Sequence, residues 1–262
     1  MDLDLTGKRA LVCGASRGIG RAVAQTLAAL GAKVTVLARS EKDLSQTVAS
    51  LDTGAGQEHG LLVTDSLSEN SLTATIKALT LETAPVQILV NNSGGPPPGP
   101  VHTADAEEFT RAFTQHVIAN HILLEALLPG MKESGYGRVI NIISTSVKEP
   151  IKGLGVSNTI RGAVASWAKT LAGELGPSGI TVNNVLPGFT STERLASLLE
   201  GRAKKTGRPL ADIEQDALNS VPMGRFARPA EIADAVAFLA SPAAAYINGI
   251  NLPVDGGRTS SL

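Results

Sequence analysis

Three glycines between residues 14 and 20 form the pattern in this sequence that most directly suggests chemistry. Gly14, Gly18 and Gly20 follow a short apolar run at residues 10–13, which is typical of a buried strand. Apolar residues then recur every three or four positions from 19 to 30, which predicts a helix. Such a turn directs free backbone N–H groups and the positive helix end at one point. The stretch therefore predicts a pyrophosphate-binding turn, with an ordinary strand-turn-helix corner as the alternative.

The elements that must position this turn alternate along the whole chain. We expect strands at residues 10–13, 33–38, 60–63, 86–90, 138–143, 180–185 and 250–254. Further helices are expected at residues 41–51, 68–83, 105–132, 155–175 and 229–240, and two short ones within an insertion at 190–222. Apolar strands that alternate with helices predict a parallel α/β sheet covered on both faces. We therefore expect one domain over residues 1–262, with a helical lid at about 190–222.

Composition excludes several classes of protein. The 262 residues carry a net charge of −1, which gives no reason to expect nucleic acid or an anionic membrane surface as a partner. No apolar stretch is as long as a membrane span, and the acidic start does not resemble a signal peptide, so we expect a cytoplasmic protein. Cys13 is the single cysteine, and the four histidines lack metal-ligand spacing, so we expect no disulfide and no metal.

Four motifs in the right order make the chain similar to the short-chain dehydrogenase/reductase family over nearly its whole length. Residues 13–20, Cys-Gly-Ala-Ser-Arg-Gly-Ile-Gly, resemble the family's T-G-x-x-x-G-x-G, and Asn-Asn-Ser-Gly at 91–94 resembles its N-N-A-G. Residues 180–188 resemble the strand and Pro-Gly turn that close over the nicotinamide. The stretch 224–257 resembles the 3-oxoacyl-ACP-reductase-like members in particular. The resemblance implies a doubly wound, Rossmann-type sheet with the cofactor at the carboxyl ends of its strands.

The residue after the second strand predicts the choice of cofactor. Arg39 stands where the ribose 2′ position would lie, and no Asp or Glu is present there. Arginine pairs with a 2′-phosphate, so with Arg17 and Ser40 nearby we expect NADP(H) to be preferred over NAD(H). Leu62 replaces the family's usual aspartate beside the adenine. Only the backbone groups at Val63 are then expected to contact the adenine there. The expected cofactor-binding residues are Gly14, Ser16, Arg17, Gly18, Ile19, Gly20, Arg39, Ser40, Val63, Asn91, Ser93, Gly94, Arg161, Pro187, Gly188 and Thr192.

The catalytic stretch departs from the family pattern of Asn, Ser, Tyr and Lys. Ser144 falls at the position of the serine that polarises the carbonyl oxygen. Ser157 and Arg161 stand at the tyrosine and lysine positions, and His116 stands at the asparagine position. Serine is a far weaker acid than tyrosine, and arginine does not give up its proton. His116 is a candidate replacement acid because imidazole titrates near neutrality; alternatively it only fills a vacated site.

Three functions fit this combination. The first is an NADP(H)-dependent oxidoreductase acting on a small carbonyl or alcohol, of which a 3-oxoacyl compound is one example. The second is an NADP(H)-binding protein without turnover, and the third is a non-redox enzyme on the same scaffold that uses His116. We favour the first because it explains both the intact cofactor motifs and the retained Ser144. The substrate and the direction of reaction stay open.

The resemblance also implies a homo-oligomer, a tetramer or a dimer. In the family, the elements that correspond to the predicted helices 105–132 and 155–175 and to the C-terminal segment pair subunits. Small residues on the second helix, Ala163, Ala165 and Ala168, would allow close approach of a partner helix.

Overall fold

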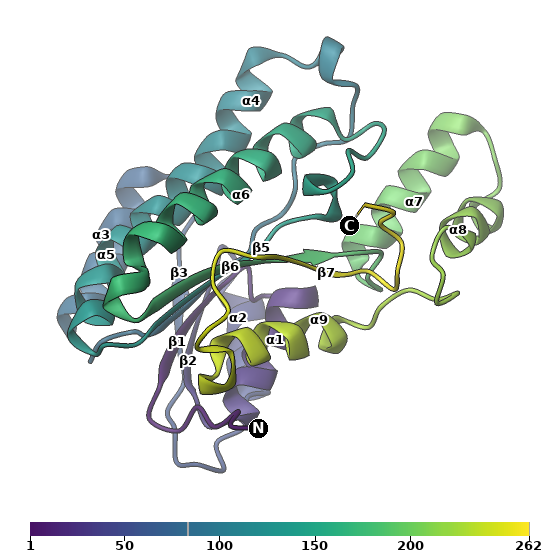
Figure 1. The fold of residues 1–262 in the computed structure, drawn as a ribbon. Coiled ribbons are helices and arrows are strands. Elements are labelled where there is room, and N and C mark those ends of the chain that lie inside the picture. The colour runs from purple at the N-terminus through teal and green to yellow at the C-terminus, as the bar shows by residue number, and fades with distance from the viewer. Residues whose placement is uncertain (83, 262) are drawn as a thin grey trace.

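Seven parallel strands build a single sheet in a computed structural model that describes residues 1–82 and 84–261 (Figure 1). Their order across the sheet is β3-β2-β1-β4-β5-β6-β7. The strands are β1 (Arg9–Cys13), β2 (Lys33–Ala38), β3 (Gly60–Val63), β4 (Ile88–Asn91), β5 (Gly137–Ile142), β6 (Ile180–Pro187) and β7 (Asn251–Val254). The order runs outward from β1 in both directions, so the predicted doubly wound, Rossmann-type sheet is confirmed.

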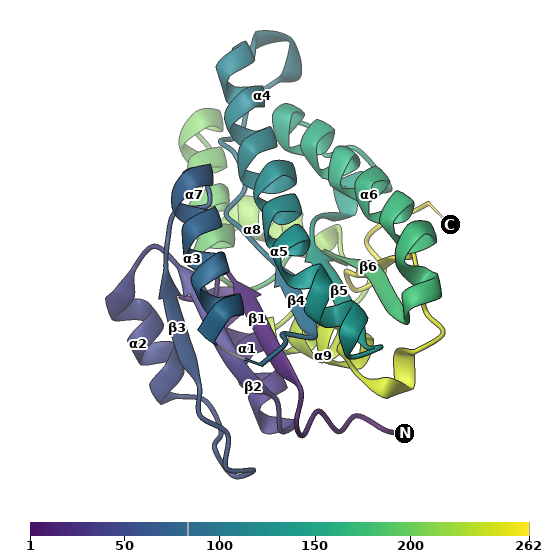
Figure 2. The ribbon, with the colours of Figure 1, turned by 90° about the vertical axis from the view of Figure 1, so that its left-hand side faces the viewer.

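Helices cover both faces of this sheet (Figures 1 and 2). One face carries α1 (Gly18–Ala29), α2 (Glu41–Ala49) and α9 (Pro229–Ala240), and the other carries α3 (Glu69–Glu82), α5 (Ala119–Glu133) and α6 (Gly155–Leu175). Alternate strand residues face the two layers: Val12 and Val90 pack in the first core, Leu11 and Leu89 in the second. Because both faces are covered, the strands are apolar almost throughout.

The predicted helix 105–132 is divided around His116. Helix α4 (Ala106–Phe113) is followed by a π-helical turn at Thr114–Ile118, and α5 then continues the same rod. Turns of this kind insert one extra residue and are frequent at functional sites. The π turn therefore sets where the side chain of His116 points.

The insertion forms two helices, α7 (Glu193–Thr206) and α8 (Leu210–Asn219), as the sequence predicted. A small apolar cluster that includes Leu195, Leu199 and Ile213 holds the two together. They lie beyond the carboxyl ends of the central strands (Figure 1). In the described part of the chain, no helix is long and apolar enough to cross a membrane.

Some predicted details were wrong. The helix expected at 41–51 ends at Ala49, and the strand expected from residue 250 begins at Asn251. Residue 83, the expected end of a helix, lies outside the described residues. Ala165 and Ala168 are buried against their own chain, at 9% and 0% exposed, so these two methyl groups cannot contact a partner helix as predicted.

Four asparagines cross the sheet side by side. Asn91, Asn141, Asn184 and Asn251 occupy paired positions on β4, β5, β6 and β7. Each Nδ2 donates to the Oδ1 of the next residue, at 2.8, 2.9 and 2.8 Å. Since a shift by one residue would separate all of these amides, the row specifies the register of four strands.

Candidate active site

The glycine turn between β1 and α1 has the geometry that a phosphate needs. Gly14 and Gly18 adopt φ values of +59° and +56°, in the left-handed region that favours glycine. A Cβ on Gly20 would lie 2.3 Å from the carbonyl oxygen of Gly14. Arg17, at the N-cap of α1, forms no side-chain cap, so the first N–H groups of that helix stay available to an anion. The turn therefore fits the pyrophosphate of a dinucleotide.

Two polar side chains outside the predicted set hold this turn in place. Asn92 Nδ2 donates to the carbonyl oxygens of Cys13 and Gly14, at 3.4 and 3.3 Å. Thr47 Oγ1, fully buried on α2, donates to the carbonyl oxygen of Ala15 at 3.0 Å. The Asn-Asn motif signalled Asn92, whereas no sequence pattern linked Thr47 to the turn because its partner lies on another element.

The carboxyl end of β2 presents a free positive charge. Arg39 is exposed, and no acidic side chain pairs with it among residues 1–82 and 84–261. Ser40 caps α2 by accepting from the backbone N–H of Asp43 at 3.3 Å. Arg17 forms an exposed ion pair with Glu193 at the start of α7. The unpaired Arg39 fits a 2′-phosphate, and Arg17 reaches one only by leaving Glu193.

The start of the lid lies over the glycine turn. Thr192 caps α7, and its methyl carbon is 3.4 Å from the point that a Cβ on Gly18 would occupy. Pro187 ends β6, and a Cβ on Gly188 would lie 2.6 Å from Cα of Asp255, so the chain can pass there only with glycine. Val63 ends β3 with its side chain 44% exposed. These predicted residues therefore lie along the edge of the sheet formed by the carboxyl ends of its strands, and this edge is the candidate site.

Ser144 follows β5 and is arranged to donate a hydrogen bond. Its Oγ accepts from the backbone N–H of Ser146 at 3.1 Å, which orients the side chain and leaves its hydroxyl proton free. Ser157 lies half-buried in the first turn of α6, one turn before Arg161. Two hydroxyl groups and one guanidinium are therefore supplied by β5 and α6.

Arg161 is a buried charge that forms no ion pair with any carboxylate of the described residues. The residue is 7% exposed, and its Nη1 donates to the carbonyl oxygen of Ile142 at 3.2 Å. Burial and, second, the charge of Arg194 lower the pKa of Arg161 to about 10, so the guanidinium stays charged at neutral pH. Arg194 Nη2 donates to the carbonyl oxygens of Pro96 and Gly95, at 3.0 and 3.5 Å. Sequence reasoning missed Arg194, because only the fold of α7 brings it to this loop.

His116 is buried and neutral. It is 1% exposed, and its Nδ1 lies 2.7 Å from Oγ of Ser93. Its Nε2 has no hydrogen-bond partner in the part of the chain that the structure describes. Burial and, second, the charge of Arg161 lower the pKa of His116 to about 2. The ring therefore cannot act as a charged acid near neutral pH, and this physical reason weakens the prediction that it replaces the tyrosine.

Asn91, a predicted cofactor residue, uses its side chain inside the sheet. It is 2% exposed and donates to Asn141, so its amide positions β4 within the sheet and is not free to contact a cofactor. Ser93 is likewise engaged with His116, and the carbonyl oxygen of Gly94 accepts from Nε2 of Gln115 at 3.2 Å. What this loop offers a cofactor is therefore mainly its backbone.

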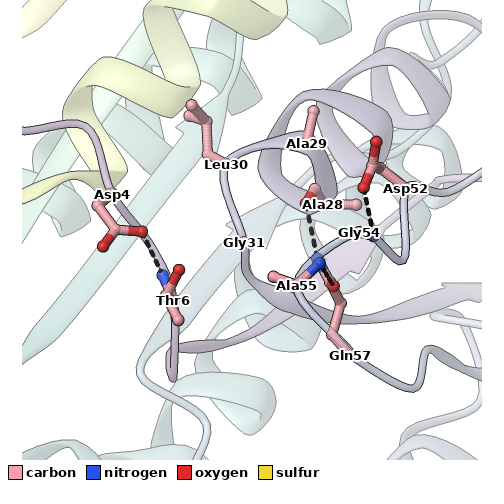
Figure 3. Close-up of a pocket in the computed structure, with 10 residues that line it drawn as sticks. All are labelled: Asp4, Thr6, Ala28, Ala29, Leu30, Gly31, Asp52, Gly54, Ala55 and Gln57. Atoms are coloured by element: carbon pink, nitrogen blue, oxygen red, sulfur yellow. Dashed lines mark hydrogen bonds between the residues drawn. The ribbon is translucent and has the colours of Figure 1, made fainter.

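A separate hollow of about 400 Å³ lies at the other end of α1, away from the glycine turn (Figure 3). Its acidic side chains already have partners, since Asp4 accepts from Thr6 N at 2.9 Å and Asp52 from Gly54 N at 2.7 Å. Gln57 Nε2 donates to the carbonyl oxygen of Ala28 at 2.8 Å. Asp4, Asp52 and Gln57 thus form hydrogen bonds within the lining of this hollow.

Comparison with known proteins agrees with this geometry. The model of the enoyl-(acyl carrier protein) reductase family matches residues 14–259. The 3-oxoacyl-[acyl-carrier-protein] reductase FabG of Vibrio cholerae is 39% identical over 97% of this chain and 98% of its own length. L-sorbose reductase from Gluconobacter frateurii, solved with NADPH and L-sorbose, is 30% identical with a TM-score of 0.93 over the whole of both chains. YwfH, an NADPH-dependent reductase involved in bacilysin biosynthesis, is 28% identical with a TM-score of 0.91 over 97% of this chain and 99% of YwfH.

The chain therefore belongs to the short-chain dehydrogenase/reductase family, whose members of known activity among these relatives are oxidoreductases. Within that family it is of the 3-oxoacyl-ACP-reductase-like kind.

Proposed function

We propose that this protein is an NADP(H)-dependent oxidoreductase that interconverts a small carbonyl compound and its alcohol, a 3-oxoacyl compound being one candidate. The observation that carries the proposal is the Ser144 hydroxyl, oriented by Ser146 with its proton free, at the same carboxyl-terminal edge of the sheet as the glycine turn. Relatives described as NADPH-dependent support the cofactor, as does the unpaired Arg39.

Each part of the candidate site would then have a role in holding the cofactor, which supplies or accepts the hydride when it is bound. The glycine turn and the start of α1 bind the pyrophosphate through backbone N–H groups. Arg39, Arg17 and Ser40 would bind the 2′-phosphate. Thr192 closes over the turn from the lid.

The reacting carbonyl accepts a hydrogen bond from Ser144 as negative charge develops on its oxygen. Arg161 adds a fixed positive charge in a buried setting, where such a charge stabilises an oxyanion more than it would in water. We propose that Ser157 relays the proton: its hydroxyl protonates the product alkoxide while a solvent water returns a proton to Ser157. His116 stays neutral and supports the loop through Ser93.

A protein that binds NADP(H) without turnover is the second candidate. It is favoured by the serine, Ser157, that stands at the family's tyrosine position. Tyr136 does not replace that tyrosine, because its hydroxyl donates to the carbonyl oxygen of Ala240 at 2.6 Å and it precedes the amino end of β5. Oxidation of NADPH with a panel of aldehydes and ketones, and reduction of NADP⁺ with alcohols, separates the two. Turnover of any compound supports the oxidoreductase, whereas tight NADPH binding with no turnover supports the second candidate.

We also propose that the protein forms a homotetramer, as the family resemblance implies. The solvent-facing side of α6, which carries Ser166, Lys169 and Thr170, is available for a partner. Light scattering at micromolar concentration tests the assembly, and a monomer there contradicts it.

A further inference from the structure

Two arginines of the candidate site, Arg161 and Arg194, have no negative partner in the described part of the chain. Ion pairs there include Arg17 with Glu193, Arg208 with Asp216 and Arg225 with Glu231, but none reaches Arg161 or Arg194. A charge taken out of water without a counter-ion is costly, and Arg161 is only 7% exposed. The arrangement is therefore explained more readily by an anion that the free protein does not contain.

The two guanidinium groups point to one place. Their Nη2 atoms lie 3.6 Å (Arg194) and 4.0 Å (Arg161) from the point that a Cβ on Gly95 would occupy. The groups that they contact, the carbonyl oxygens of Ile142, Gly95 and Pro96, satisfy some N–H donors but carry no net charge. Because Gly95 has no side chain, the space between the arginines is not filled at that residue.

We propose that Arg161 and Arg194 form an anion subsite beside Gly95 that binds the carboxylate of the substrate, so that the substrate is an oxo acid or the corresponding hydroxy acid. This inference rests on the proposed function, because it concerns the substrate of that same site. Guanidinium groups bind carboxylates through paired, charge-assisted hydrogen bonds. Nη1 of Arg161 donates to the carbonyl oxygen of Ile142, two residues before Ser144. A carboxylate bound by Arg161 would therefore lie near the carbonyl group that Ser144 polarises.

The cofactor's own phosphates are the other source of such an anion. The glycine turn and the start of α1 serve the pyrophosphate, and Arg39 serves the 2′-phosphate. Arg194 contacts a different loop, through Pro96 and Gly95 after β4. The subsite is therefore assigned to the substrate, and an effect of Arg194 on cofactor affinity is the observation that separates the two sources.

Titration calorimetry on the full chain with NADP⁺ bound tests the subsite without any turnover. The probes are 2-oxobutanoate and 3-oxobutanoate, each compared with its methyl ester. We expect at least one acid to bind about tenfold or more tighter than its ester. Arg194→Gln should remove that preference, Arg194→Lys should keep part of it, and Arg202→Gln, which removes an exposed charge on the same helix, should leave it unchanged.

Equal binding of acids and esters by the wild type would overturn the subsite. So would a fall in NADPH affinity for Arg194→Gln with the acid preference unchanged, because the arginine would then serve the cofactor. Since binding is measured with the oxidised cofactor, an acid preference that depends on Arg194 upholds the subsite even if no compound is ever turned over. Turnover of neutral carbonyl compounds alone, with no acid preference, would uphold the oxidoreductase and reject the subsite.

Discussion

Nδ1 of the His116 ring lies 2.7 Å from Oγ of Ser93, and both residues depart from the family pattern of asparagine and alanine at these positions. The contact joins the loop after β4 to the π-helical turn. Nε2 is buried and has no hydrogen-bond partner within residues 1–82 and 84–261. The pair therefore fixes a neutral imidazole between two elements of the site, beside the charge of Arg161.

The buried imidazole makes stability depend on pH. The pKa of His116 is about 2 in the folded state and about 6.5 when unfolded, so between these values only the unfolded chain binds the proton. Stability therefore falls as the pH falls below 6.5. The free energy of unfolding of the wild type should drop by about 2 kcal/mol from pH 7 to pH 5 relative to His116→Asn.

Urea unfolding at the two pH values measures this difference. His102→Asn is the control, because His102 is exposed. The same pH dependence in wild type and His116→Asn would mean that His116 is protonated in the folded protein, and its role as an acid would regain support.

Arg39 should decide between the two cofactors. Its charge has no acidic partner among the described residues, so a 2′-phosphate gains a charge-assisted pair at no cost to an ion pair seen there. Arg39→Ala should weaken NADPH binding by about tenfold or more and leave NADH binding nearly unchanged. Fluorescence titration of both cofactors measures this. Equal affinity of the wild type for NADPH and NADH would contradict the assignment.

Glu193 should compete with NADPH for Arg17. The ion pair is exposed, with 70% and 73% of the two side chains accessible, so breaking it costs at most about 1 kcal/mol. Glu193→Gln should therefore raise the affinity for NADPH up to about fivefold without changing that for NADH. Glu200→Gln, which removes an exposed charge from the same helix, is the control. A lower NADPH affinity in Glu193→Gln would contradict this competition.

Cys13 should limit the stability of the sheet. Asn91 Oδ1 ends the asparagine row and has no hydrogen-bond partner in the described part of the chain. Cys13 is its neighbour on β1, one residue after the pair Val12 and Val90. A threonine there, as in the family, supplies a hydroxyl donor. Cys13→Thr should be about 1 kcal/mol more stable than Cys13→Val, which has the same shape without the hydroxyl. Equal unfolding free energies of the two variants would show that Asn91 does not accept from residue 13.

Much of the fold could be predicted because each strand is a short apolar run between turn residues. The glycine turn was equally clear, since Gly14 and Gly20 have no room for a Cβ and local spacing alone reports this. The π turn at His116 left no such signal, because an extra residue in a helix changes hydrogen bonding without changing residue type.

The contacts that Glu193 and Arg194 make with the rest of the site could not be predicted. Arg194 and Glu193 act through contacts with Pro96 and Arg17, and these depend on where α7 lies after folding. The inward position of Ala165 and Ala168 was missed for a related reason, because small apolar residues suit a core as well as a partner helix.

The central claim is that Ser144 polarises a carbonyl for reduction by NADPH. The most direct measurement is NADPH oxidation with a carbonyl panel that includes oxo acids, for wild type, Ser144→Ala and the double variant Ser157→Tyr with Arg161→Lys. Wild type should turn over at least one compound, and Ser144→Ala should lower kcat/KM by about a hundredfold with NADPH affinity unchanged. If the site is a weakened reductase, the double variant should raise the rate. Tight NADPH binding with no turnover by the wild type or the double variant would contradict the claim and leave a protein that only binds the cofactor.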